Sequence, residues 1–194
     1  MAVKRIRSPL DAKTVRGLTC GERVLVSGTI VTGRDQVHKY LAEGGDAPID
    51  LSGMVIYHCG PVVVKDARGW KITAAGPTTS MREEPYQAKV IERFRIGAVM
   101  GKGGMGPATL AAMQAHGSVY LHVTGGAAQY LARCITAVQE VHLLERFGQP
   151  EAMWVLAVQD LPAYVTMDSH GKSLHTAVEE ESARNFKLLL EEEA

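Results

Sequence analysis

The segment from residue 96 to residue 135 constrains the fold most, because strand-like and helix-like runs alternate within it. The apolar run "IGAVM" precedes the glycine-rich "GKGGMG", and helical spacing then extends from about Pro107 to His116. The apolar run "SVYLHVT" and the helix-like "GGAAQYLARCI" repeat this order. Strands that alternate with helices predict parallel strands joined by crossover helices. We therefore expect an α/β fold.

The flanking segments add further strands and helices. Residues 23–31 are rich in β-branched side chains, and "RDQVHKYLAEGG" after them ends in glycines that suit a helix C-terminus. "GMVIYHCG" and residues 69–76 predict strands, and we expect this earlier, strand-rich part to be antiparallel. "PYQAKVIERF" predicts a helix, and "WVLAV" and "AYVTMD" predict two separate strands. Residues 1–194 are expected to form a single domain, in which residues 176–194 form a charged helical tail.

Length and charge exclude several classes of protein. A chain of 194 residues with 46% hydrophobic composition can bury a substantial core. Lys+Arg and Asp+Glu both number 21, so no positive excess indicates a nucleic acid or a membrane surface as partner. The N-terminal stretch lacks an apolar signal region, and no run approaches the roughly 20 apolar residues of a membrane span. A cytoplasmic protein is expected.

Cys20, Cys59 and Cys134 stand far apart, without a CxxC pair. This spacing argues against a disulfide framework and against a zinc ribbon, and iron–sulfur ligands usually include closely spaced pairs. We interpret the three cysteines as reduced core thiols and predict no metal ligands in this chain.

Two polar segments at predicted strand ends are candidates for function. In "TGRDQVHK", His38 shares a helix face with Arg34 and Asp35, so the carboxylate can fix the tautomer of the imidazole. An Asp in the first turn of a helix also favours the helix dipole, which leaves a structural role open. In "YHCGP", His58 is more simply interpreted as a hydrogen-bonded histidine at a strand end.

The stretch "GPTTS" at residues 76–80, followed by Arg82, is the third candidate. Its hydroxyl and amide groups can face an anion that the guanidinium binds bidentately. A turn stabilised by its own hydroxyl groups, with a solvated arginine, is the alternative.

The fourth candidate, "GKGGMG", matches the GxGxxG pattern of dinucleotide-binding proteins. The match comes halfway along the chain, and the next predicted strand ends without an acidic residue for a ribose hydroxyl. Lys102 within the glycines favours another use, in which amides and one ammonium surround a small anion at a helix N-terminus.

Together, the loops supply three cations, Arg34, Arg82 and Lys102, beside a cluster of hydroxyl groups. Two carboxylates and a developing negative charge need such a set, so we predict a dicarboxylate site. Dehydration of a 2-hydroxy dicarboxylate also needs a Lewis acid to help hydroxide leave. The scattered Cys and His residues offer no convincing metal site here, so another chain is expected to provide the metal.

The chain also resembles a known family through "GTIVTGRDQVHKYL", "IYHCGPVV", "AGPTTSMR", "VMGKGGMGP" and "QPEAMW". In order, from about residue 20 to residue 175, these segments are similar to the β subunit, or C-terminal domain, of class I iron–sulfur fumarases and L(+)-tartrate dehydratases. The resemblance implies a swivelling β/β/α domain of three layers: a central, partly parallel sheet, a second antiparallel sheet and helices. It also implies a hetero-oligomer with an α subunit that carries a [4Fe-4S] cluster on its own cysteines. A homodimer of the isolated chain is left open.

The resemblance assigns roles to particular residues. Thr78 corresponds to the threonine assigned as catalytic base in related fumarases, and Thr79, Arg34, Arg82 and Lys102 correspond to groups that hold the substrate carboxylates. His38, in the "RDxxH" pattern, is a further candidate for proton transfer. Many single-chain fumarases have Ala-Gly before the arginine, whereas this chain has Ser80 and Met81, a form nearer to the two-subunit enzymes.

The expected activity is the reversible hydration of fumarate to L-malate by a hydro-lyase β subunit. Dehydration of L(+)-tartrate to oxaloacetate is the alternative activity. A non-catalytic module that binds a nucleotide or a small anion is the alternative of another class, and it rests on "GKGGMG".

Overall fold

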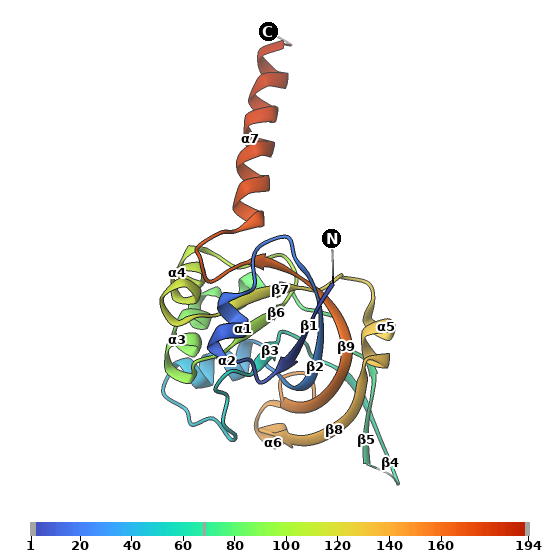
Figure 1. The fold of residues 1–194 in the computed structure, drawn as a ribbon. Helices are drawn as coiled ribbons and strands as arrows, with labels where there is room; N and C mark the ends of the chain where they lie inside the picture. Colours follow the sequence, from blue (N-terminus) through green and yellow to red (C-terminus); the bar gives the residue numbers. More distant parts are fainter. Residues whose placement is uncertain (1–2, 68, 193–194) are drawn as a thin grey trace.

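The computed structural model describes residues 3–67 and 69–192, in which a seven-stranded mixed sheet forms the centre (Figure 1). The strands are, in spatial order, β1 (Val3–Ser8), β2 (Arg23–Thr32), β3 (Val55–Tyr57), β6 (Ala98–Gly101), β7 (Val119–His122), β9 (Met153–Met167) and β8 (Ile135–His142). A second, antiparallel sheet consists of β4 (Val62–Asp66) and β5 (Gly69–Ala74). The helices are α1 (Ala12–Arg16), α2 (Asp35–Ala42), the 3-10 turn η1 (Ser80–Glu83), α3 (Glu84–Phe94), α4 (Pro107–His116), α5 (Ala128–Arg133), α6 (Leu144–Phe147) and α7 (Leu174–Glu192).

The central sheet closes on itself through its long strand β9. Neighbouring strands from β1 to β7 are parallel, and β9 pairs antiparallel with β7 and β8. The opposite edge of β9 pairs with β2, so β2, β3, β6, β7 and β9 form a closed ring. The carboxyl ends of the parallel strands consequently meet at one rim, where ligands usually bind in α/β folds.

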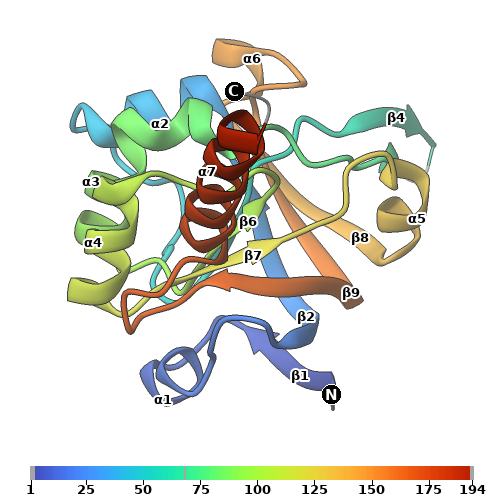
Figure 2. The same cartoon turned by 90° about the horizontal axis from the view of Figure 1, so that it is seen from above.

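The inner parallel strands β3, β6 and β7 are buried on both faces. On β3, Val55 and Tyr57 belong to the core cluster that includes residues of β8 and β9, whereas Ile56 packs with the helices. Val99 of β6 and Tyr120 of β7 also face the helical side. Figure 2 shows α2, α3 and α4 on this side of the sheet and α5 with β4 and β8 on the other. Burial on both faces explains the continuous apolar runs in these strands.

Helix α4 has the bounds expected from the sequence, Pro107–His116. Pro107 begins the helix, where its missing N–H costs nothing, and Gly117 ends it with a left-handed φ of 75°. The parallel β6–α4–β7 crossover is confirmed as well.

Two expectations about strands were wrong. Residues 153–167 form one strand, β9, because the chain continues through Asp160 and Pro162 while pairing with β2. The earlier segment is antiparallel only in the β4–β5 hairpin, since β2 and β3 are parallel with α2 as their crossover. The sequence analysis also missed β1, β4 and β8.

The charged C-terminal segment forms α7, which begins at Leu174 and extends away from the sheet (Figure 1). The last two residues of the expected tail, 193 and 194, lie outside the described residues. None of the helices in the described part of the chain combines the length and apolar character needed to span a membrane.

Candidate functional site

The "GPTTS" segment inserts between the ends of β3 and β6 as a short additional strand. The Thr78 N–H donates to the His58 carbonyl at 2.7 Å, and the Lys102 N–H donates to the Thr78 carbonyl at 3.3 Å. The Ser80 N–H donates to the Lys102 carbonyl at 2.9 Å, and Thr79 and Lys102 form a parallel β-bridge. Backbone pairing therefore brings two candidate segments, 76–80 and 101–106, to the same place on the rim.

A series of hydrogen bonds between buried side chains holds this inserted segment on its buried side. The Tyr120 hydroxyl donates to Ser80 Oγ at 2.8 Å, and Ser80 Oγ lies 2.8 Å from His58 Nδ1. His58 Nε2 lies 2.9 Å from Gln87 Oε1, and all four side chains are buried. The interpretation of His58 as a hydrogen-bonded histidine is confirmed. Ser80, Gln87 and Tyr120 were not predicted, because nothing in their local sequence connects three distant segments.

His38 lies beneath the rim and is fully buried. Its Nδ1 lies 3.1 Å from the Arg34 carbonyl oxygen, and its ring meets the His58 ring edge-on, with centroids 4.8 Å apart. Burial lowers the pKa of His38 to about 4, so the imidazole is neutral near pH 7. The Asp35 carboxylate was expected to fix the tautomer of the His38 imidazole. In the structure, the Arg34 carbonyl oxygen does so instead.

Arg34 lies between β2 and α2, and its side chain passes over Gly60. Its Nε lies 3.3 Å from Glu151 Oε1, and the other oxygen of Glu151 accepts from the Gln36 N–H at 3.0 Å. A Cβ at Gly60 would lie 2.6 Å from an Arg34 guanidinium nitrogen and 2.7 Å from the Pro150 carbonyl oxygen. Only glycine therefore fits in the "YHCGP" turn, and Glu151 of "QPEAMW" joins the site as a residue that sequence reasoning missed.

Arg82 forms an ion pair with Asp35, the residue next to Arg34. Asp35 opens α2 and Arg82 lies in η1, so this pair ties the ends of two elements together. The Arg82 side chain is 56% exposed and can also reach a ligand in solvent. The charges of both Arg82 and Arg34 act on the Asp35 carboxylate.

Lys102 follows β6, and its side chain passes Gly125, whose added Cβ would lie 3.6 Å from Lys102 Cδ. Within residues 3–67 and 69–190, no carboxylate lies close enough to pair with the Lys102 ammonium. This half-buried cation is available to an external anion.

The pattern "GKGGMG" predicted that backbone N–H groups at the N-terminus of α4 bind a small external anion. These N–H groups already have a partner within the chain. The Glu84 carboxylate accepts from the backbone N–H groups of Gly106, Ala108 and Thr109 at 2.8, 3.1 and 3.2 Å. The Thr109 hydroxyl donates to the same carboxylate at 2.6 Å. An internal carboxylate thus occupies the amides that a bound phosphate would use.

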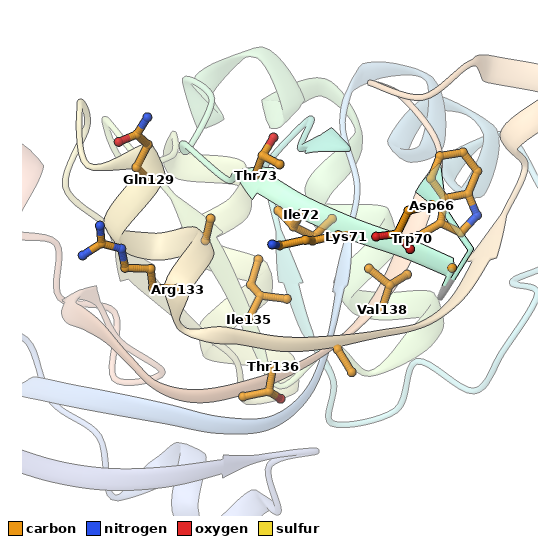
Figure 3. Close-up of a pocket in the computed structure, with 13 residues that line it drawn as sticks. Asp66, Trp70, Lys71, Ile72, Thr73, Gln129, Arg133, Ile135, Thr136 and Val138 are labelled. Atoms are coloured by element: carbon orange, nitrogen blue, oxygen red, sulfur yellow. The ribbon is translucent and has the colours of Figure 1, made fainter. Parts of the chain in front are cut away.

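A hollow away from the rim has a volume of about 660 Å³. It lies between β5, α5 and β8, where Lys71, Ile72, Arg133 and Ile135 line it (Figure 3). None of the predicted site residues contributes to it.

The residues of this chain do not fit an iron–sulfur cluster. Cys59 is buried, Cys20 and Cys134 are half-buried, and all three are free. Burial raises the pKa of both Cys20 and Cys59 to about 12, which disfavours the thiolate that iron needs. Among the described residues, no group of three His, Cys, Asp or Glu side chains is arranged to hold a metal ion.

The fold and the site define an α/β protein with a cationic, hydroxyl-bearing rim at the carboxyl ends of parallel strands. The chain belongs to the Fumarase C-terminus family, whose model matches residues 3–178. It is 57% identical over 187 residues to a putative fumarate hydratase class I of Geobacillus stearothermophilus, covering 96% of this chain and 36% of that relative.

Two further relatives are named as β subunits. The chain is 36% identical over 190 residues to the L(+)-tartrate dehydratase subunit beta of Escherichia coli K12, covering 97% of this chain and 90% of that protein. It is 38% identical over 174 residues to a putative L(+)-tartrate dehydratase subunit beta of Methanocaldococcus jannaschii, covering 87% and 89%. The expected family is thereby confirmed.

Proposed function

We propose that this chain is the β subunit of a hydro-lyase that interconverts fumarate and L-malate. The observation that carries the proposal is the β-bridge between Thr79 and Lys102. It joins the hydroxyl segment to a cation that forms no ion pair with the side chains of residues 3–67 and 69–190. The 57% identity to a putative fumarate hydratase supports fumarate as the substrate. We also propose the swivelling β/β/α arrangement, which follows from the resemblance, and a cytoplasmic location.

Arg34, Arg82 and Lys102 are proposed to hold the two substrate carboxylates. Removal of a proton next to a carboxylate places negative charge on that carboxylate, and fixed cations stabilise this charge without reorganisation. Thr79 adds a hydroxyl group at the same rim. These contacts would orient the substrate as well as bind it.

Thr78 is proposed as the catalytic base, following the resemblance. Its hydroxyl donates to the His58 carbonyl at 3.1 Å, which directs the oxygen lone pairs away from that carbonyl. A threonine hydroxyl acts as a base only where neighbouring cations lower its pKa. Lys102 contacts Thr78 through its backbone N–H, which donates to the Thr78 carbonyl. The complete burial of His38 leaves it no direct access to a ligand, so we propose that it positions Arg34 through the Arg34 carbonyl.

A second chain is proposed to complete the site. The tartrate dehydratase relatives are named as β subunits, which implies an α subunit. We propose that the [4Fe-4S] cluster lies on that partner, because this chain lacks a ligand set for it. The resulting assembly is a hetero-oligomer.

L(+)-tartrate is the second candidate substrate. The tartrate dehydratase β subunits match this chain over 90% and 89% of their own length, whereas the fumarate hydratase relative matches over 36% of its length. Both substrates are dicarboxylates, and the same three cations suit either.

The substrate is tested with the purified chain and its anaerobically reconstituted partner. Hydration of fumarate to malate supports the proposal, and turnover of tartrate without fumarate hydration supports the second candidate. The nucleotide-binding alternative predicts that NAD raises the melting temperature of the isolated chain. We expect no such shift, because Glu84 occupies the amides at the N-terminus of α4.

A further inference from the structure

Two carboxyl groups lie next to Arg82: Glu83, which is buried, and Asp35, which is half-buried. Glu83 is 0% exposed, and neither of its oxygens receives an N–H or O–H donor from the described residues. Oδ1 of Asp35 is also buried without such a donor, while Oδ2 of Asp35 pairs with Arg82. The Asp35 and Glu83 carboxyl groups are close enough to interact, so each affects the ionisation of the other. Two neighbouring carboxyl groups repel each other when both are ionised, so the pair favours a state in which one of them carries a proton.

The surroundings determine which carboxyl group carries the proton. Burial, followed by the interaction with Asp35 and the charges of Asp35 and Glu151, raises the pKa of Glu83 to about 8. Burial acts in the same direction on Asp35, but the interaction with Glu83 and the charges of Arg82 and Arg34 hold its pKa below the usual value. Glu83 is therefore the acid and Asp35 the carboxylate near pH 7.

The charges facing Glu83 come from several elements. Asp35 belongs to α2, Arg82 to η1, and Glu151 to the segment before β9. On α3, the neighbouring Glu84 is turned toward the N-terminus of α4 instead. With Glu83 neutral, the two arginines balance Asp35 and Glu151. Ionisation of Glu83 adds one uncompensated negative charge next to Arg82.

We propose that Glu83 is a positioning residue, whose carboxyl proton is shared with Asp35 and holds Arg82 ready for a substrate carboxylate. This inference rests on the proposed function for its substrate. Loss of the proton gives Arg82 a second anionic partner and repels a dianion such as fumarate. Binding of the substrate should therefore weaken as Glu83 ionises, even though fumarate itself stays fully ionised throughout this range.

The proton is located by ¹³C NMR of the carboxyl carbons in the full chain, with the Glu83 signal assigned through its own backbone amide. We expect a titration midpoint near pH 8, following the raised pKa of Glu83. A midpoint near the ordinary value of about 4.3 would overturn the inference. This measurement needs no enzymatic activity, so it decides on Glu83 even if the complex hydrates neither substrate and the proposed function fails.

The link to Arg82 is tested by the KM for fumarate in the reconstituted complex between pH 7 and pH 9.5. In the wild type, KM should rise about tenfold per pH unit above the midpoint, because only the protonated form binds. Glu83→Gln keeps an N–H donor toward Asp35 and cannot ionise, so its KM should stay flat. Glu92→Gln, an exposed site on α3, should follow the wild type. An equal rise in wild type and Glu83→Gln would refute the positioning role.

Discussion

Thr79 and Lys102 pair as a parallel β-bridge beyond the ends of β3 and β6. Lys102 makes this bridge through its backbone, so the position of its side chain is set without any side-chain partner among the described residues. Truncation of the lysine side chain should therefore leave the inserted segment in place. Substitutions among the buried residues that contact the inserted segment should displace it.

Gly101→Ala should destabilise the protein and displace the inserted segment. An added Cβ would lie 2.0 Å from Ser80 Oγ and 3.2 Å from the Tyr120 hydroxyl oxygen, and all three residues are buried. We expect a loss of at least about 2 kcal/mol in the free energy of unfolding, measured by urea denaturation. Gly125→Ala, whose Cβ would make only an ordinary contact with Lys102, is the matched control. Equal stability of the two variants would show that Ser80 is not anchored in this way.

His38→Gln should weaken the dependence of stability on pH in the acid range. The folded-state pKa of His38 is lowered to about 4, so between that value and 6.5 the unfolded chain binds a proton that the native state does not. His38 alone should therefore cost the wild type about 3 kcal/mol of stability as the pH falls through this window. Urea unfolding of wild type and variant at several pH values measures the difference. An unchanged slope in His38→Gln would contradict the prediction.

Glu84→Ala should loosen the start of α4. The substitution leaves three backbone N–H groups and the Thr109 hydroxyl without their shared acceptor. We expect a loss of about 2 kcal/mol, since hydrogen bonds to charged groups are stronger than neutral ones. Unfolding in urea provides the measurement, and Glu92→Ala on the exposed face of α3 provides the control. A Glu84→Ala protein as stable as the Glu92→Ala protein would argue against this cap.

Local patterns in the sequence were sufficient to predict α4, the β6–α4–β7 crossover and the cations at strand ends. Each of these depends on residues close together in the chain: Pro107 and Gly117 bound the helix, and Lys102 directly follows its strand. The direction of β2 relative to β3 was not predictable in this way, because β9, more than 120 residues later than β2, takes the other edge of β2. Pairing across such a distance has no local signal.

The polar groups around the site were harder to predict than the cations. Asp35 was expected to fix the tautomer of His38. Instead, Asp35 pairs with Arg82, which is 47 residues away in the chain. Glu151 and Glu83 were not predicted as residues of the site. Their burial beside the arginines follows from tertiary packing, which also produces the raised pKa of Glu83.

The most direct test of the shared dicarboxylate site is the kcat/KM for fumarate hydration by the reconstituted complex. We predict that Arg82→Ala and Lys102→Ala each lower kcat/KM at least about a hundredfold, because each removes a cation that stabilises charge in the transition state. Lys89→Ala, at an exposed position on α3, should match the wild type. An active complex in which both Arg82→Ala and Lys102→Ala keep the wild-type kcat/KM would contradict the account.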